Sequence, residues 1–316
     1  MGLFKKSRRN AGYLAISFID GGICAVQINR SASSRPAVGV MGFHALEHPV
    51  NEAALEKFAK EIDAGAYQCG TLLAPNEYQL LSVDAPNVPP DELKTAIRWR
   101  LKDMLDFHID DATIDVLDVP VDKNAPTRNH SMFAVAARNH VVQRCQNLFG
   151  EAKIPLSVID IPDTAQRNFS AMLEPEGRGV AMLSFDSTGG LLTITYSGEL
   201  YLSRRIDITL AQIRQGDTEP QNACFDRVTL ELQRSLDHFD RQYHFITVSK
   251  LVLAPLGMSG EALKDYLAAN LYIPVESFDM ESVLDISNAP ALKSPESQQR
   301  YFLTLGAALR HEEVAL

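Results

Sequence analysis

The stretch that decides the fold is "LAISFIDGGICAVQI" (14–28), in which two apolar runs flank a turn made of Asp20, Gly21 and Gly22. This order is typical of a β-hairpin. The backbone N–H groups of a glycine-rich turn can bind an anion, so the turn is also a candidate phosphate site. Glycine occurs in hairpin turns for a simpler reason as well, because it tolerates a positive φ.

The same pattern returns in "AMLSFDSTGGLLTITYSGELYLSRRI" (181–206). The two stretches align with Ser17-Phe18 on Ser184-Phe185, Asp20 near Asp186, and Gly21-Gly22 on Gly189-Gly190. An internal repeat at this separation predicts two related halves that each begin with a hairpin. The alternative is a chance similarity between two strand-turn-strand units.

Candidate strands alternate with candidate helices along most of the chain, which predicts an α/β fold. The segment 84–160 has the order of a compact αββαβ insertion, and "EPEGRG" (174–179) is the clearest linker. We therefore expect a first half in 1–83 that returns near 156–175, an inserted subdomain in 84–155 and a second half in 176–316.

Composition excludes several classes of protein. The 316 residues carry a formal charge of −10, which argues against a nucleic-acid binder. No segment approaches the roughly 20 apolar residues that span a bilayer. The four cysteines are scattered, which favours buried free thiols in a reducing cytosol. The chain has neither the P-loop motif nor a G-x-S-x-G elbow.

The first ten residues, "MGLFKKSRRN", place Lys5, Lys6, Arg8 and Arg9 behind two apolar side chains. One interpretation is a solvated tail. The other is weak attraction to an anionic membrane surface, worth about 1 kcal/mol per basic residue. Such a segment biases location but does not anchor a protein alone.

Two further features are given structural interpretations. Asp106, His108 and Asp110 alternate in "DFHIDDATIDVLD", but the stretch lacks the glycine and glutamate of an EF-hand loop. We interpret it as the solvent face of an extended segment. The single tryptophan, Trp99, has apolar neighbours along the helix and is predicted to lie in the core.

Several longer strings resemble the actin-like PilM family of type IV pilus assembly, and most closely its MshI branch from mannose-sensitive (MSHA) pilus systems. They cover nearly the whole chain: "MGLFKK", "AIRWRLKDMLDFHIDDATIDV", "FAVAARNHVVQRCQNLF", "LELQRSLDHFDRQY" and "LTLGAALR". The resemblance implies an actin/FtsA-type fold of two related halves, with a small SHS2-like αββαβ subdomain inserted in the first.

The resemblance also implies partners and a location. Members of the family work at the cytosolic face of the inner membrane. They bind the cytosolic tail of a PilN-like bitopic protein in a groove beside the inserted subdomain, and they connect the membrane complex indirectly to the pilus motor ATPase or platform proteins. Self-association is a further possibility, and nucleic acid is not an expected partner.

The nucleotide motifs of the family are altered in this chain. Ser17 and Ile19 stand where active relatives have the acid and glycine of Asp-x-Gly-Ser, Ser184 replaces the acid of the second turn, and Pro255 and Leu256 replace a late glycine pair. We therefore expect a non-enzymatic protein without a cofactor. An ATP- and magnesium-binding protein with divergent turns is the alternative. A sugar or acetate kinase of the same superfold would need a catalytic acid that no motif supplies.

Overall fold

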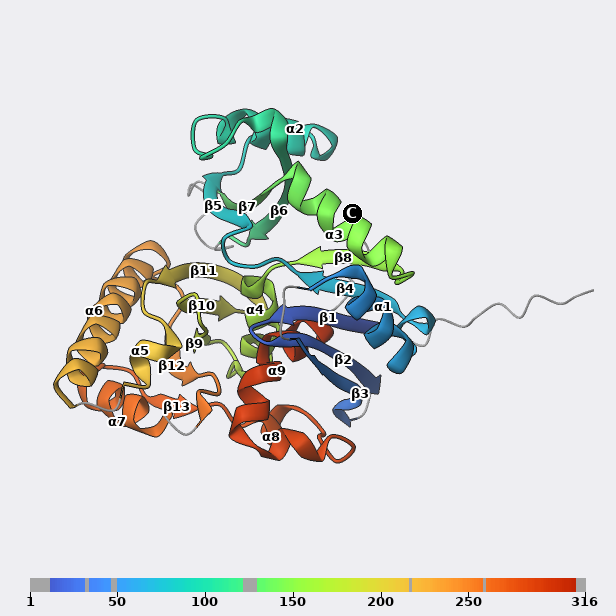
Figure 1. Cartoon of the computed structure of the whole chain (residues 1–316). Coiled ribbons are helices and arrows are strands. Elements are labelled where there is room, and N and C mark those ends of the chain that lie inside the picture. Colours follow the sequence, from blue (N-terminus) through green and yellow to red (C-terminus); the bar gives the residue numbers. More distant parts are fainter. Residues whose placement is uncertain are drawn as a thin grey trace, which may run out of the picture.

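The computed structural model describes residues 12–31, 34–46, 50–121, 130–215, 218–257 and 260–310. Two halves lie side by side, and a smaller unit stands above them (Figure 1). The basic side chains of Lys5, Lys6, Arg8 and Arg9 lie outside the described residues. Within the described ranges, no helix combines the length and the apolarity needed to cross a membrane.

The first half is built on a five-stranded mixed sheet. In spatial order its strands are β3 (Ser34–Ala45), β2 (Gly22–Ser31), β1 (Tyr13–Ile19), β4 (Gln68–Leu72) and β8 (Leu156–Asp160). β1, β2 and β3 pair antiparallel as consecutive strands, whereas β4 and β8 extend the sheet in parallel. The first hairpin therefore supplies the centre of this sheet.

The second half repeats this topology. Its sheet has the order β11 (Glu199–Ile206), β10 (Gly190–Tyr196), β9 (Gly179–Phe185), β12 (Val248–Leu253) and β13 (Val275–Ser277), with the same alternation of antiparallel and parallel pairs. The predicted internal repeat is confirmed. The two hairpins differ in their turns, because β1 pairs Ile19 directly with Gly22 while β9 and β10 are joined by the four residues 186–189.

Two long helices occupy the space between the sheets. α4 (Pro162–Leu173) follows β8 of the first half but packs on β9, β10 and β11 of the second. α9 (Pro295–Ala308) follows the second half but packs on β1, β2 and β4 of the first. The helices cross each other in the middle of the molecule (Figure 1). Each half is thus covered by a helix that the other half contributes.

Further helices cover the outer faces of the sheets. Asn51 is the N-cap of α1 (Glu52–Glu61), because its side chain accepts a hydrogen bond from the Ala54 N–H. With α3 (Asn139–Glu151), α1 buries Leu55, Phe58 and Phe149 on the first sheet. The second sheet is covered by α6 (Thr218–Gln242) and α7 (Gly260–Asn270), and the short helices are α5 (Leu210–Ile213) and α8 (Met280–Val283).

The inserted unit has different limits from those predicted. β5 (Tyr78–Asp84), assigned above to the first half, pairs along its whole length with β7 (Ser131–Arg138) in a three-stranded sheet completed by β6 (Ala112–Val119). β8, the last strand of the expected αββαβ order, joins β4 in the first sheet, which agrees with the predicted return of the first half near residue 156. The inserted unit consequently has the order β5-α2-β6-β7-α3.

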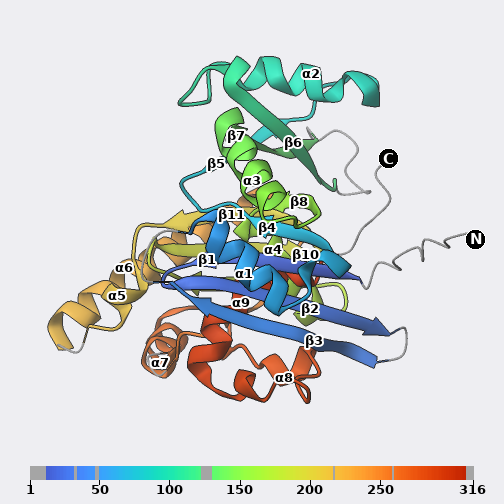
Figure 2. The ribbon, with the colours of Figure 1, turned by 45° about the vertical axis from the view of Figure 1, so that its right-hand side comes forward.

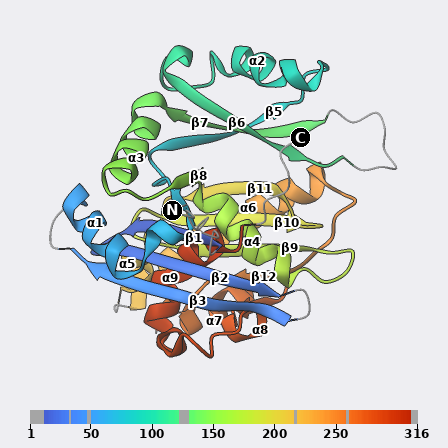
Figure 3. The same cartoon turned by 90° about the vertical axis from the view of Figure 1, so that its right-hand side faces the viewer.

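The prediction that Trp99 lies in the core is wrong. α2 (Pro90–Leu101) turns Ile97 and Leu101 into the core of the inserted unit, and both are fully buried. Trp99 is 71% exposed on the other side of the same helix. α2 lies on the side of the small sheet that faces away from the two halves (Figures 2 and 3). The tryptophan therefore stands on an outer surface of the inserted unit.

The acidic segment after α2 is solvent-facing as expected, but its conformation differs from the prediction. Asp106, His108 and Asp110 are exposed, and the residues Ile109–Asp111 form a short 3₁₀-helix instead of an extended strand. The Asp110 N–H donates to Nδ1 of His108 at 3.3 Å. The described part of the chain contains no group of three or more side chains suited to a metal ion.

The two sides of α2 give a matched pair of substitutions. Ile97→Ala removes a buried side chain and is expected to lower the free energy of unfolding by about 2–5 kcal/mol. Trp99→Ala removes a larger but exposed side chain and is expected to change it by no more than about 0.5 kcal/mol. Urea unfolding followed by circular dichroism measures both. A larger loss for Trp99→Ala than for Ile97→Ala would contradict the placement of α2.

Candidate functional site

The first candidate turn consists of Asp20 and Gly21 between β1 and β2. Gly21 has a φ of 81°, which favours glycine, and its carbonyl accepts a hydrogen bond from the Leu46 N–H at 2.8 Å. A Cβ on Gly22 would overlap the carbonyl oxygen of His44. Both glycines are therefore required by the hairpin itself, and Asp20 remains exposed at its tip.

The second candidate turn is closed by its own acid. The carboxylate oxygen Oδ1 of Asp186 accepts hydrogen bonds from the Thr188 N–H at 2.7 Å, the Thr188 hydroxyl at 2.6 Å and the Gly189 N–H at 3.1 Å. This is an Asx-type turn. The N–H groups that a phosphate would use already bind a carboxylate within the turn.

Packing explains the glycine pair of the second turn. Gly189 has a φ of 151°, and a Cβ there would lie 2.8 Å from the carbonyl oxygen of Ile206. A Cβ on Gly190 would lie 2.7 Å from the ring of Phe185. These glycines, like the first pair, are needed for the close approach of neighbouring strands.

Ser17 and Ser184, which stand at the acid positions of the family motif, bind the crossing helices. The Ser17 hydroxyl forms a hydrogen bond with that of Thr304 on α9. The Ser184 hydroxyl donates to Oε1 of Gln166 on α4 at 2.5 Å. Both serines are buried, with 3% and 9% exposure. Each hairpin thus uses one serine to form a hydrogen bond with the helix that the other half contributes.

Gln166 connects α4 to three strand positions at once. Its Nε2 donates to the carbonyl oxygens of Met182 and Leu191 at 2.9 and 3.1 Å, and to the Thr193 hydroxyl at 2.9 Å. The side chain is completely buried. A buried amide with its donors and acceptor satisfied fixes the position of the helix on the sheet. Sequence reasoning missed this residue, because a lone glutamine in a helix carries no motif.

The third altered position of the nucleotide motif is filled by apolar packing. Leu256 is 2% exposed and belongs to the core of the second half. Its carbonyl accepts a hydrogen bond from Nη2 of Arg214 at 3.1 Å, and the same nitrogen donates to Oε1 of Gln299 on α9 at 2.5 Å. The arginine therefore ties this segment to α9.

A second buried polar group, which the sequence did not reveal, joins the inserted unit to both halves. The Tyr78 hydroxyl of β5 donates to Oδ2 of Asp163 on α4, and the Ser203 hydroxyl of β11 donates to Oδ1 of the same carboxylate. Nη2 of Arg205, also on β11, donates to the Tyr78 oxygen at 2.6 Å. We call Tyr78, Asp163, Ser203 and Arg205 the junction cluster.

The junction cluster lies at the base of the inserted unit. Asp163 is 2% exposed, and Arg205 balances its charge at 3.7 Å. Burial raises the pKa of Tyr78 well above its usual value, and the Asp163 carboxylate adds to this while Arg205 opposes it. Leu80 and Leu117 of the inserted sheet also pack against the core of the second half. The inserted unit is thus held by polar and apolar contacts together.

No family model and no curated protein sequence matches this chain. Its structure is similar to that of a PilM–PilN type IV pilus biogenesis complex, with a TM-score of 0.71 and 19% identity over 96% of this chain and 99% of the other. It is also similar to a Bacteroides thetaiotaomicron protein with an actin-like ATPase fold and unknown function, with a TM-score of 0.50 and 11% identity over 92% and 99% of the two chains. This chain has an actin-like fold.

A third similar structure is the cytoplasmic domain of EpsL, an inner-membrane component of the type II secretion system of Vibrio cholerae. Its TM-score is 0.50, with 13% identity over 95% of this chain and 96% of the other. The actin-like fold expected from the sequence is therefore confirmed. In this fold the structure places the six candidate residues on two turns or directly after them, and each turn is closed by atoms of its own half: Asp20, Gly21, Gly22, Asp186, Gly189 and Gly190.

The two turn acids should differ in their contribution to stability. Asp186→Ala removes the acceptor of three hydrogen bonds and is expected to lower the free energy of unfolding by about 1 kcal/mol, as loss of a helix cap does. Asp20→Ala is the matched control and is expected to change it by no more than about 0.5 kcal/mol. Chemical denaturation measures both. Equal effects would contradict the closed second turn.

The junction cluster gives a pH-dependent prediction. Tyr78→Phe leaves the buried Asp163 carboxylate without one donor, so we expect a loss of about 1–3 kcal/mol in the free energy of unfolding. Since the pKa of Tyr78 is raised in the folded state, its contribution is complete below its ordinary pKa of 10.0 and is lost as pH rises through the folded pKa. The difference in the free energy of unfolding between wild type and Tyr78→Phe should therefore narrow above about pH 10.

Urea unfolding at several pH values measures this difference. Tyr67→Phe is the control, because the Tyr67 hydroxyl makes no hydrogen bond within the described residues. An effect of Tyr78→Phe no larger than that of Tyr67→Phe would refute the role of the junction cluster.

Proposed function

We propose that this chain is a non-enzymatic adaptor of a type IV pilus machine of the MSHA kind. It binds the cytosolic tail of a PilN-like inner-membrane protein and links the membrane alignment complex to the motor ATPase or platform proteins. Support comes from the likeness to the PilM–PilN complex over nearly the whole chain. The family strings in the sequence point in the same direction.

The observation that carries the non-enzymatic part of the proposal is the closed second turn. Hydrolysis of a nucleotide requires free donors for the phosphates and an acid that orients a metal ion. In this chain Asp186 binds the turn N–H groups, and Ser184 binds Gln166 instead of facing a metal. A carboxylate beside a phosphate is repulsive unless a divalent ion lies between them. The site therefore favours a structural role.

The inserted, SHS2-like unit is the proposed location of the partner tail. The face of its sheet that α2 covers has a core of its own, with Ile97, Leu101 and Val83 buried there. The junction cluster fixes the base of the unit to both halves. A unit whose base is fixed in this way suits a peptide groove beside it, because a preorganised surface lowers the entropic cost of binding.

The location that follows is the cytosolic face of the inner membrane. The membrane protein supplies the anchor in this proposal, and the adaptor is peripheral. The basic segment with Lys5, Lys6, Arg8 and Arg9 adds weak attraction to anionic lipid. Assembly of several copies beside one another would give the membrane complex a multivalent base.

Isothermal titration of the full chain with the N-terminal cytosolic tail of the PilN-like protein tests the proposal. We expect saturable binding in the micromolar range, since short peptides bind such domains weakly. A scrambled tail of the same composition is the control. The single tryptophan, Trp99 on the inserted unit, gives a second signal through its fluorescence. Absence of heat at high-micromolar peptide would rule out the adaptor role.

Isothermal titration also distinguishes the proposed adaptor from an actin-like ATPase. With magnesium and millimolar ATP we expect neither heat nor an increase in melting temperature, because a ligand stabilises the folded state only to the extent that it binds. Saturable heat together with a higher melting temperature would instead establish the alternative, in which ATP binds through the altered turns.

A further inference from the structure

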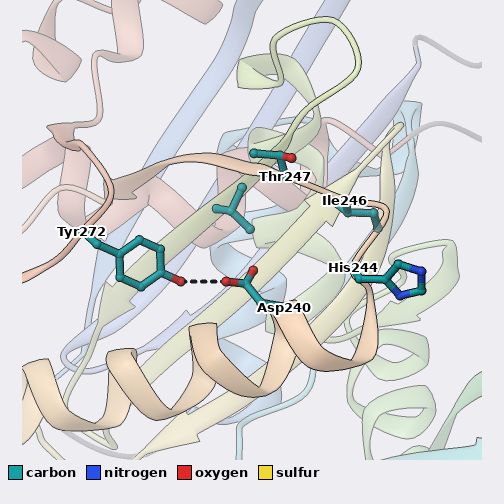
Figure 4. Close-up of a pocket in the computed structure, with 6 residues that line it drawn as sticks. Asp240, His244, Ile246, Thr247 and Tyr272 are labelled. Atoms are coloured by element: carbon teal, nitrogen blue, oxygen red, sulfur yellow. Dashed lines mark hydrogen bonds between the residues drawn. The ribbon is translucent and has the colours of Figure 1, made fainter.

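A small hollow lies in the second half, at the C-terminal end of α6 (Figure 4). Its volume is about 280 Å³. Its lining comes from the end of α6, from the segment that enters β12 and from the residues after α7: Asp240, His244, Ile246, Thr247, Val248 and Tyr272. None of these residues takes part in the turns or in the junction cluster.

The hollow is amphipathic. Ile246 and Val248 are buried, with 2% and 8% exposure, and provide an apolar lining. Tyr272 is 61% exposed and presents its ring from one side, with its hydroxyl donating to Oδ2 of Asp240 at 3.1 Å. The ring of His244 points away from this pair (Figure 4). An aromatic wall, an aliphatic lining and one carboxylate thus share a single space.

The acidic group in the lining of the hollow is the Asp240 carboxylate. Burial raises the pKa of Tyr272, and the carboxylates of Asp240 and Asp237 raise it further. Neither carboxylate forms an ion pair with a lysine or arginine in the described part of the chain. The C-terminal end of α6, a helix of 25 residues, adds a partial negative charge, and Arg241 in its last turn is not part of the lining. A cation is therefore attracted to this end of the helix.

We propose that the hollow receives a lysine or arginine side chain from a partner protein. The aliphatic stem of such a side chain packs on Ile246 and Val248, as long basic side chains do at apolar surfaces. Its charged end lies over the Tyr272 ring and beside the Asp240 carboxylate, where a cation–π contact and an ion pair can form together. This adds a partner-contact site on the second half, independent of the proposed tail site.

Other occupants fit less well. A purely apolar side chain fills the lining but offers no charge to the Asp240 carboxylate, and an anion is repelled. A divalent ion needs several ligands, whereas the described residues include no group of three or more side chains suited to a metal. An amphipathic cation satisfies the apolar and the charged walls together.

Amide chemical shifts of the full chain, titrated with N-acetylated tripeptides Gly-Arg-Gly and Gly-Lys-Gly, test this proposal. We expect saturable shifts at Thr247, Val248 and Tyr272, with a millimolar affinity that falls as salt is raised. Asp240→Asn should weaken binding by about fivefold or more, and Tyr272→Leu should do the same. Glu219→Gln, at the exposed N-terminal end of α6, is the matched control and should leave the affinity unchanged.

Peptides with citrulline or norleucine in the central position separate charge from shape. If both neutral peptides bind much more weakly than the arginine and lysine peptides, the proposal is supported. If either neutral peptide binds with the same affinity as the basic peptides, the proposal is refuted, because the Asp240 carboxylate then contributes nothing to binding. Saturation by spermidine without saturation by the basic peptides would make the hollow a site for a small organic cation and would also overturn the proposal. Absence of shifts at tens of millimolar peptide has the same effect.

Discussion

The close approach of α4 and α9 is the constraint on which the rest of the molecule depends. A Cβ on Gly306 would overlap the carbonyl oxygen of Ala165, so only glycine lets the two helices cross at this distance. Nδ2 of Asn168 donates to the Gly306 carbonyl at 2.9 Å and fixes the crossing. Because each helix also binds a hairpin serine, the position of both sheets follows from this one contact.

This arrangement explains why the hairpins keep the form of a phosphate site but not its chemistry. At the two positions where the family motif has an acid, this chain has Ser17 and Ser184, and both form contacts between the halves. Ser17 and Ser184 are short enough to lie between strand and helix and still satisfy a buried partner. Hydrogen bonds of this kind hold the two halves in a fixed arrangement. Such an arrangement is compatible with the proposed adaptor role, in which the protein binds partners at its surface.

Much of the architecture was predictable from local pattern. The hairpins, the Asn51 cap and the repeat are encoded within a few neighbouring residues. The sheet to which β5 belongs was not predictable, since β5 is a short strand and its partner β7 is distant in sequence. The exposure of Trp99 was predictable, because the period of a helix places Ile97 and Leu101 on one side and residue 99 on the other. The contact between Tyr78 and Asp163 spans 85 positions and leaves no local trace.

The exchange of α4 and α9 makes the two halves depend on each other for a buried sheet face. Each half lacks the helix that covers its own inner sheet face and receives it from its neighbour, which is the geometry of a domain-swapped dimer joined by a linker. A fragment that ends after β8 would leave this face of the first sheet open to water. The duplicated unit is therefore not an autonomous domain, and the pair is the smallest part that can fold around this interface.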